Sequence, residues 1–137
     1  MKVGFIGLGN VGSKLAESLL RNKFDLTVID LNNNLVKDFI SKGSTTAKSP
    51  KELAEKVDLI ITCLPSPKIC ADVMEKKGGV IEGLSKGKIW LEMSTTDDKE
   101  VKRIGELVKI KEAIPLDAPV SGGCHRAATG NIAIFVG

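Results

Sequence analysis

Three glycines close to the start of the chain have the spacing of a phosphate-binding loop. Gly7, Gly9 and Gly12 form a G-x-G-x-x-G pattern between the apolar run KVGFI (2–6) and an amphipathic stretch that begins at Val11. Glycines so placed permit a tight turn, let phosphate oxygens approach bare backbone, and let the next helix pack against the strand. The first turn of that helix adds unpaired N–H groups and a partial positive charge. The sequence contains 14 glycines, so the informative feature is the position of these three between a strand and a helix.

An acidic residue at the end of the next apolar run indicates a dinucleotide as the ligand. Asp30 ends LTVID (26–30), about 20 residues after the glycines. A carboxylate there can accept hydrogen bonds from both hydroxyls of an adenosine ribose, and it repels a 2′-phosphate. Leu31 and three asparagines follow, without an arginine that would pair such a phosphate. We therefore expect NAD rather than NADP, while a turn or N-cap role for Asp30 before a helix at 33 stays compatible with this.

Proline, hydroxyl and glycine residues also follow three later apolar runs. They are Pro65 after DLIITCL (58–64), STT (94–96) after KIWLEM (88–93), and PVSGG (119–123) after AIPLDA (113–118). The carboxyl ends of parallel strands meet at one edge of a sheet, where ligands bind. The alternatives are a strand end, a helix cap and a flexible turn. The two glycines after Ser121 favour a nest of N–H groups for a small carboxylate.

Short apolar runs alternate with helical patterns along the whole chain. The expected strands are 2–6, 26–30, 58–64, 88–93, 113–118 and 131–136, with helical patterns between them. The run 58–64 lacks alternation, which is typical of a parallel strand covered on both faces. The pattern predicts an α/β fold, a doubly wound, mostly parallel Rossmann-type sheet with helices on both faces. We expect residues 1–137 to form one dinucleotide-binding domain.

Composition argues against several other classes of function. Hydrophobic residues make up 42%, charged residues 27%, and the net charge of +3 is spread over interspersed acids and bases. That distribution does not favour nucleic-acid binding. No apolar run approaches the roughly 18 residues of a membrane span, and no signal segment is expected before the first strand. Cys63, Cys70 and Cys124 form no C-x-x-C pair, so we expect free thiols, no metal site and a cytoplasmic location, with Cys63 as a small core residue.

Four motifs in order resemble the β-hydroxyacid dehydrogenases, which include 3-hydroxyisobutyrate dehydrogenase and tartronate semialdehyde reductase. They are GFIGLGNVG, ITCLPSP, LEMSTT and LDAPVSGG…TGNIAIFVG, and the resemblance covers residues 2–137. It implies hydride transfer between a nicotinamide cofactor and a small hydroxyacid or semialdehyde. The cofactor-binding residues that it implies are Gly7, Leu8, Gly9, Asn10, Val11, Gly12, Asp30, Leu64, Pro65 and Thr95. The substrate-binding residues that it implies are Ser121, Gly122 and Gly123.

Several positions depart from the pattern of this family. Glu92 stands where the family usually has Asp, and Ile69 stands where a cofactor-contacting Asn is common. The usual V-x-x-A after Ser-Gly-Gly becomes CHRA. We interpret His125, the only histidine, as a first-turn helix residue at the rim of the site rather than as a proton donor.

The resemblance also implies a catalytic lysine on a long helix that leads into an all-helical second domain. No lysine here falls in a corresponding motif, and we interpret Lys68 and Lys88 as surface residues. We therefore expect the chain to be the cofactor domain of a longer, homo-oligomeric dehydrogenase, with no catalytic residue of its own. The isolated chain should bind NAD weakly and turn over little or no hydroxyacid.

Other members of the same fold stay open as alternatives. One is an imine reductase or reductive aminase, which replaces the lysine, although DAPVSGG favours a hydroxyacid. Another is a non-catalytic nucleotide-binding module. A 6-phosphogluconate dehydrogenase fits less well, because the residues before Ser-Gly-Gly differ in that branch.

Overall fold

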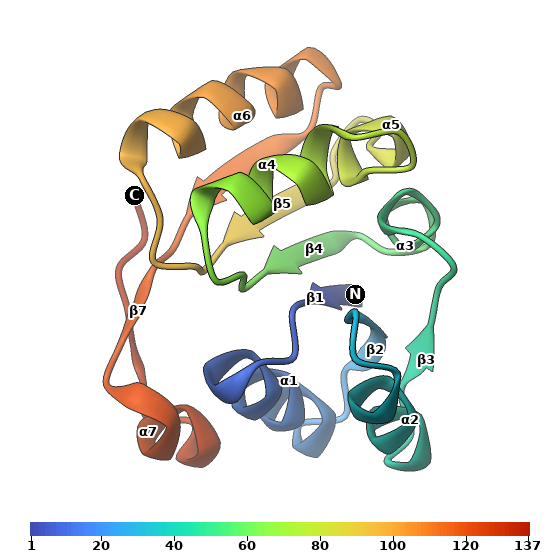
Figure 1. Ribbon diagram of the computed structural model, residues 1–137, viewed down its shortest axis with the longest axis vertical. Helices are drawn as coiled ribbons and strands as arrows, with labels where there is room; N and C mark the ends of the chain where they lie inside the picture. The colour runs from blue at the N-terminus through green and yellow to red at the C-terminus, as the bar shows by residue number, and fades with distance from the viewer.

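Six strands form one parallel sheet in the computed structural model, which describes residues 1–137 (Figure 1). Their order is β3-β2-β1-β4-β5-β6, the arrangement of a Rossmann fold, with the reversal of strand order between β1 and β4. The strands are β1 (Lys2–Ile6), β2 (Asp25–Ile29), β3 (Thr45–Thr46), β4 (Leu59–Thr62), β5 (Ile89–Glu92) and β6 (Ile114–Asp117). The predicted doubly wound α/β fold is confirmed.

Helices cover both faces of this sheet. They are α1 (Asn10–Arg21), α2 (Asn33–Ser41), α3 (Pro50–Lys56), α4 (Pro67–Glu75), α5 (Val80–Gly83), α6 (Asp98–Ile110) and α7 (Gly123–Thr129). Figure 1 shows α1, α2 and α7 on one side and α4, α5 and α6 on the other. Phe5 and Phe39 belong to the core of the first side, and Trp90 and Leu53 belong to the core of the second. None of these helices combines the length and the apolar character that crossing a membrane requires.

The shortest elements were missed by the sequence patterns. Strand β3 has two residues and helix α5 has four, which is too short for a hydrophobic period to appear. The residues 94–96 do not cap α6, because the side chain of Asp97 accepts a hydrogen bond from the Lys99 N–H (2.8 Å) at its start. The longer strands and helices begin and end within a few residues of the predicted bounds.

The final expected strand was placed wrongly. Only Ala133–Ile134 forms a strand, β8, and it pairs antiparallel with β7 (Val120–Ser121) in a separate two-stranded ribbon. A strand that pairs parallel to its predecessor needs a crossover connection of about a dozen residues or more. Here the chain reverses direction within residues 122–132, through Gly122 (φ +130°) and the short helix α7. This helix packs on α1, where Arg21 donates to the Ala128 carbonyl (2.6 Å).

Lys88 is a structural residue rather than a surface one. Its ammonium group donates to the carbonyls of Ala54 (2.5 Å), Glu55 (3.0 Å) and Val57 (2.7 Å) at the end of α3. These carbonyls lack intrahelical partners, so the lysine caps the helix. Burial lowers the pKa of Lys88 from its ordinary value. The side chain therefore joins the start of β5 to the end of α3.

Candidate functional site

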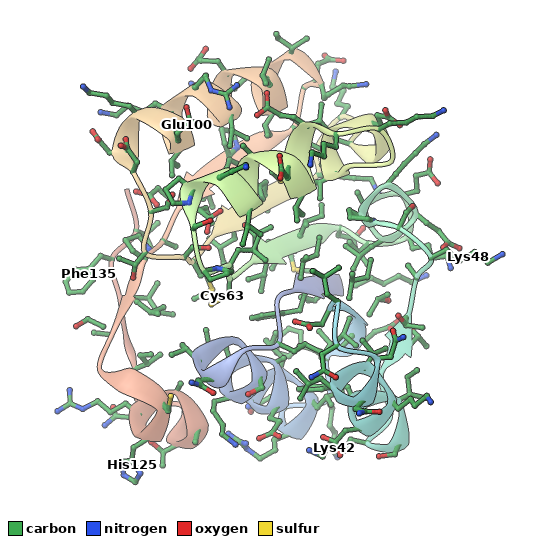
Figure 2. The ribbon with its side chains drawn as sticks, viewed as in Figure 1. Lys42, Lys48, Cys63, Glu100, His125 and Phe135 are labelled. Atoms are coloured by element: carbon green, nitrogen blue, oxygen red, sulfur yellow. The ribbon has the colours of Figure 1, made fainter.

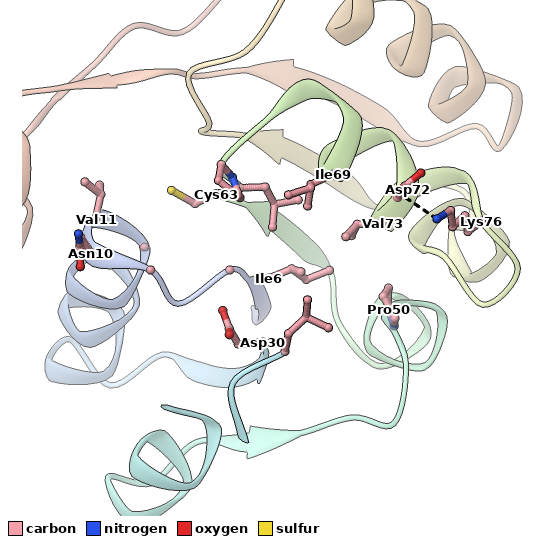
Figure 3. Close-up of a pocket in the computed structure, with 16 residues that line it drawn as sticks. Ile6, Asn10, Val11, Asp30, Pro50, Cys63, Ile69, Asp72, Val73 and Lys76 are labelled. Carbon is pink, nitrogen blue, oxygen red and sulfur yellow. Dashed lines mark ion pairs between the residues drawn. The ribbon is translucent and has the colours of Figure 1, made fainter. Parts of the chain in front are cut away.

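A cleft of about 820 Å³ opens at the carboxyl ends of the central strands (Figure 3). It lies at the edge next to β1 and β4, the adjacent pair between which the strand order reverses, and open parallel sheets bind ligands at such a point. The expected cofactor-binding residues that line it are Gly7, Gly9, Asn10, Val11, Gly12, Asp30, Leu64 and Pro65. The structure thus brings together residues from three separate sequence motifs.

Close packing gives the glycine loop its shape. A Cβ atom on Gly12 would collide with the carbonyl of Gly7, and one on Gly7 would collide with the carbonyl of Cys63. Gly7 also has a φ of +104°, which side chains other than hydrogen rarely permit. Gly9 differs, because no atom lies within 4 Å of the place where its Cβ would stand. Its exposed backbone leaves a free approach for the diphosphate of a dinucleotide.

The N-terminus of α1 faces this opening. Gly9 is the N-cap of the 12-residue helix and has no side chain to cap it. The N–H groups of the first turn have no partners within the helix, and they carry its partial positive charge. A diphosphate would accept hydrogen bonds from these N–H groups, and its negative charge would interact favourably with the positive end of the helix. The loop and the helix end therefore fit the group that the sequence predicted.

Asp30 lies just beyond β2 and holds the loop in place. One carboxylate oxygen accepts from the N–H of Leu8 (2.7 Å) and the other accepts from the N–H of Asn32 (2.8 Å). Asn32 in turn caps α2 through its side-chain oxygen, which accepts from the N–H of Asn34 (3.0 Å). Each carboxylate oxygen keeps a further lone pair for a ribose hydroxyl. Asp30 consequently combines a structural role with a position in the cleft.

Two expected cofactor residues do not line the cleft with their side chains. The side chain of Leu8 is buried in the core, so only its backbone belongs to the loop. Thr95 is exposed after β5 and is absent from the cleft lining. Its neighbour Ser94 is buried, and the Ser94 hydroxyl accepts a hydrogen bond from the N–H of Leu64 (2.7 Å). That bond ties the end of β5 to the Leu64–Pro65 wall.

The Ser-Gly-Gly segment lies apart from the cleft. Ser121, Gly122 and Gly123 are exposed and do not line the cleft. They lead from the β7–β8 ribbon into α7, beyond α1 in Figure 1. Figure 2 shows His125 at the outer end of this helix, pointing away from Cys63. The structure does not join the predicted substrate residues to the predicted cofactor residues.

One face of α4 forms a wall of the cleft that was not predicted from the sequence. Ile69, Asp72, Val73 and Lys76 line the cleft from α4 and the residue after it, together with Pro50 and the fully exposed Leu31. The ammonium of Lys76 pairs with the carboxylate of Asp72 at 3.0 Å. The signal was available, since 69, 72, 73 and 76 follow the i, i+3, i+4, i+7 spacing of a helix face.

Cys63 is half-buried and lines the cleft rather than filling the core. Figure 3 shows its side chain between β4 and the start of α1, and all three cysteines are free. Burial, followed by the negative charge of Glu92, raises the pKa of Cys63 to about 11. The thiol is therefore neutral near pH 7 and is a poor nucleophile. Cys63 therefore contributes a neutral side chain to the lining of the cleft.

The chain matches the family described as the NAD binding domain of 6-phosphogluconate dehydrogenase over residues 2–137. It is 38% identical to mitochondrial 3-hydroxyisobutyrate dehydrogenase of Mus musculus over 135 residues, which cover 98% of this chain and 40% of that protein. It is 33% identical to 3-sulfolactaldehyde reductase of Escherichia coli K12, covering 98% of this chain and 45% of that protein. The chain thus spans less than half the length of these relatives.

A solved structure supports the same relationship. The crystal structure of 3-hydroxyisobutyrate dehydrogenase from Salmonella typhimurium superposes with a TM-score of 0.92 at 28% identity, over 99% of this chain and 47% of the other. The similarity extends over the whole sheet and over the C-terminal ribbon.

Proposed function

The chain belongs to the NAD-binding domain family of 6-phosphogluconate dehydrogenase, and on that premise we propose that it serves a β-hydroxyacid dehydrogenase. The family supports the coarser statement, an NAD(P)-binding domain of an oxidoreductase. The observation that carries the proposal is the open space over Gly9, at the uncapped start of α1 and in the same cleft as Asp30. The hydroxyacid class is supported by the relatives.

The residues of the cleft suggest how a dinucleotide lies in it. The first turn of α1 and Gly9 would hold the diphosphate, and Asp30 would accept from the adenosine ribose. In the strand order β2-β1-β4, Asp30 and Leu64 lie on opposite sides of the glycine loop. The nicotinamide half would therefore extend toward Leu64 and Pro65. A bound nicotinamide supplies or accepts the hydride of the reaction.

We propose NAD as the preferred cofactor. The Asp30 carboxylate would repel a 2′-phosphate, and the adjoining residues Leu31 and Asn32 carry no charge to pair it. Lys76 is the cationic residue of the cleft lining, and its ammonium is paired with Asp72. These local charges favour a ribose with a free 2′-hydroxyl.

The substrate, the proton donor and the cellular location are further parts of the proposal. We assign a small hydroxyacid or its semialdehyde to a site that Ser121, Gly122 and Gly123 share with residues outside 1–137. The proton-exchanging lysine of the resembling family would come from those residues too, since the chain spans 40% of the mouse relative. The parent protein would be homo-oligomeric. We assign it to the cytoplasm, because three free thiols suit a reducing compartment.

Calorimetric titration of the 137-residue chain with NAD and with NADP tests the proposal. We expect measurable NAD binding with a dissociation constant at least about tenfold lower than for NADP, a difference of about 1.4 kcal/mol. Equal affinity would overturn the cofactor preference alone. The absence of binding to either nucleotide at millimolar concentration would overturn the assignment as a cofactor-binding domain.

A further inference from the structure

A buried carboxylate lies beneath the wall of the cleft. Glu92 ends β5 and is fully buried, with 0% of its surface exposed. One of its oxygens accepts hydrogen bonds from the Thr62 hydroxyl (2.8 Å) and the Cys70 thiol (2.8 Å). The other accepts from the N–H of Ser94 (2.6 Å). No lysine or arginine pairs with this carboxylate.

The donors come from three segments that meet under the cleft. Thr62 is the register partner of Glu92 on β4, Cys70 belongs to α4, and Ser94 lies in the loop after β5. The Thr62 hydroxyl also accepts from the indole N–H of Trp90 (2.9 Å). Because neighbouring strand ends and a helix share one acceptor, their relative positions are coupled.

The Ser94 side of this network reaches the cleft itself. The N–H of Ser94 donates to Glu92, and its hydroxyl accepts from the N–H of Leu64 (2.7 Å). Leu64 and Pro65 line the cleft. A chain of two hydrogen bonds therefore connects a core carboxylate to the wall that faces the proposed nicotinamide half.

A buried acidic side chain adds little to the stability of a core. Burying an acidic side chain without a basic partner is unfavourable, and an apolar side chain of similar volume commonly gives equal or greater stability. Three donors converge on this one acid, and hydrogen bonds fix the relative orientation of their partners more strongly than apolar contacts do.

We propose that Glu92 is a positioning residue that holds Leu64 and Pro65, through Ser94, in the conformation that receives the nicotinamide half of the cofactor. It touches neither cofactor nor substrate. The inference rests on the proposed function, because it assumes that a dinucleotide occupies the cleft. It adds a specific consequence, which is that Glu92 affects one half of the ligand and not the other.

Paired titrations of the chain with NAD and with ADP test this inference. ADP carries the adenosine and diphosphate groups but lacks nicotinamide, so its binding does not require the Leu64–Pro65 wall. In Glu92→Gln, a buried N–H₂ group replaces an acceptor and faces a donor. We expect the dissociation constant for NAD to rise at least about tenfold and that for ADP to change less than about twofold.

Two further variants keep the test decisive. Ser94→Ala removes the acceptor of the Leu64 N–H but leaves the Glu92 side chain in place. It should also weaken the binding of NAD and not of ADP, and it provides the test if Glu92→Gln does not fold. Glu82→Gln alters an acid on α5 whose carboxylate accepts from the N–H of Gly78 (3.2 Å), and it should change neither constant.

The outcomes separate this inference from the proposed function. A rise for NAD alone supports the positioning role, whereas equal rises for NAD and ADP indicate general damage and overturn it. Unchanged NAD binding in both Glu92→Gln and Ser94→Ala also overturns it. Wild-type chain that binds neither nucleotide would overturn the proposed function, and this inference with it.

Discussion

The chain contains two glycine turns that lead into helices, and the structure treats them differently. In the turn from Gly7 to Gly12, backbone carbonyls press against two of the glycines, and Asp30 anchors the N–H of Leu8. In the turn at Gly122 and Gly123, a Cβ on the second glycine would meet open space, and a Cβ on the first would meet only the Arg126 side chain. The first turn is shaped by the sheet around it, and the second by its own backbone angles.

This contrast separates a formed site from an incomplete one. The first turn opens into a cleft of about 820 Å³ with walls from β1, β2, β4 and α4. The second is exposed and stands beside the ribbon residues Ile134, Phe135 and Val136, which are also exposed. Figure 2 shows Phe135 directed outward from the ribbon. Binding at the first turn should therefore need no other part of a protein, whereas binding at the second should.

The largest expected effect is that of Gly12→Ala. The new Cβ would collide with the Gly7 carbonyl, so the helix and the loop must separate. Overpacking of this kind costs about 1–3 kcal/mol of unfolding free energy. We expect a lower midpoint in urea and NAD binding weakened at least about tenfold, measured by denaturation and calorimetry.

Gly9→Ala is the matched control for that variant. Its Cβ has open space in the folded chain and its φ of −67° suits alanine, so stability should stay within about 0.5 kcal/mol of the wild type. NAD binding should still fall at least about tenfold, because the methyl group occupies the approach of the diphosphate. Unimpaired NAD binding by Gly9→Ala would contradict the proposed position of the ligand.

Asp30→Asn should have the next largest effect. The amide keeps the shape but loses the charge, and its N–H₂ group cannot accept from a backbone N–H. We expect NAD to bind about tenfold more weakly and NADP to lose little affinity, because the repulsion of its 2′-phosphate disappears. Titration with both nucleotides measures the ratio, and an unchanged preference for NAD would show that other residues select the cofactor.

Arg103→Met tests whether α4, one wall of the cleft, is held from outside by α6. The guanidinium donates to both oxygens of Glu75 on α4 (2.7 and 2.6 Å) and holds the pKa of that carboxyl below its ordinary value. A lowered carboxyl pKa contributes stability above the unfolded value near 4.5, which is lost as pH falls through the folded value. We expect a melting temperature about 2 °C lower at pH 7, since the pair is partly exposed.

The difference between wild type and Arg103→Met should shrink as the pH falls below 4.5 and vanish once the pH has passed the lowered pKa of Glu75. Lys102→Met removes a fully solvated pair with Asp98 (3.2 Å) on the same helix and should not change the melting temperature measurably. A destabilisation by Arg103→Met that persists after Glu75 has been protonated would point to lost packing of the arginine stem instead of lost charge.

Ser121→Ala should have the smallest effect on the isolated chain. Its hydroxyl is exposed and lies outside the cleft, so NAD affinity should stay within about twofold of the wild type. Calorimetry with NAD checks this. A clear loss of NAD binding would mean that the two glycine turns form one site, against the separation seen in the structure.

Much of the lining of the cleft was predictable because its sequence signals are local. The spacing of Gly7, Gly9 and Gly12, and the place of Asp30 after the next strand, follow from a strand-loop-helix geometry that a few residues specify. Pro65 was expected at this edge because it follows a strand of the parallel sheet, whereas Leu64 was implied by the family resemblance. The wall on α4 was predictable in principle, since its helix spacing is visible in the sequence.

What sequence alone determined is the longer strands and helices, the glycine loop and the acid that accompanies it, since each depends on neighbours along the chain. Tertiary structure decided which distant groups meet. Glu92 gathers Thr62 and Cys70 only because β4, β5 and α4 converge, and Lys88 reaches the end of α3 for the same reason. Tertiary structure also decided that β8 pairs with β7 and not with the parallel sheet. The chain reverses direction before β8, so the strand that it can reach is the antiparallel neighbour β7.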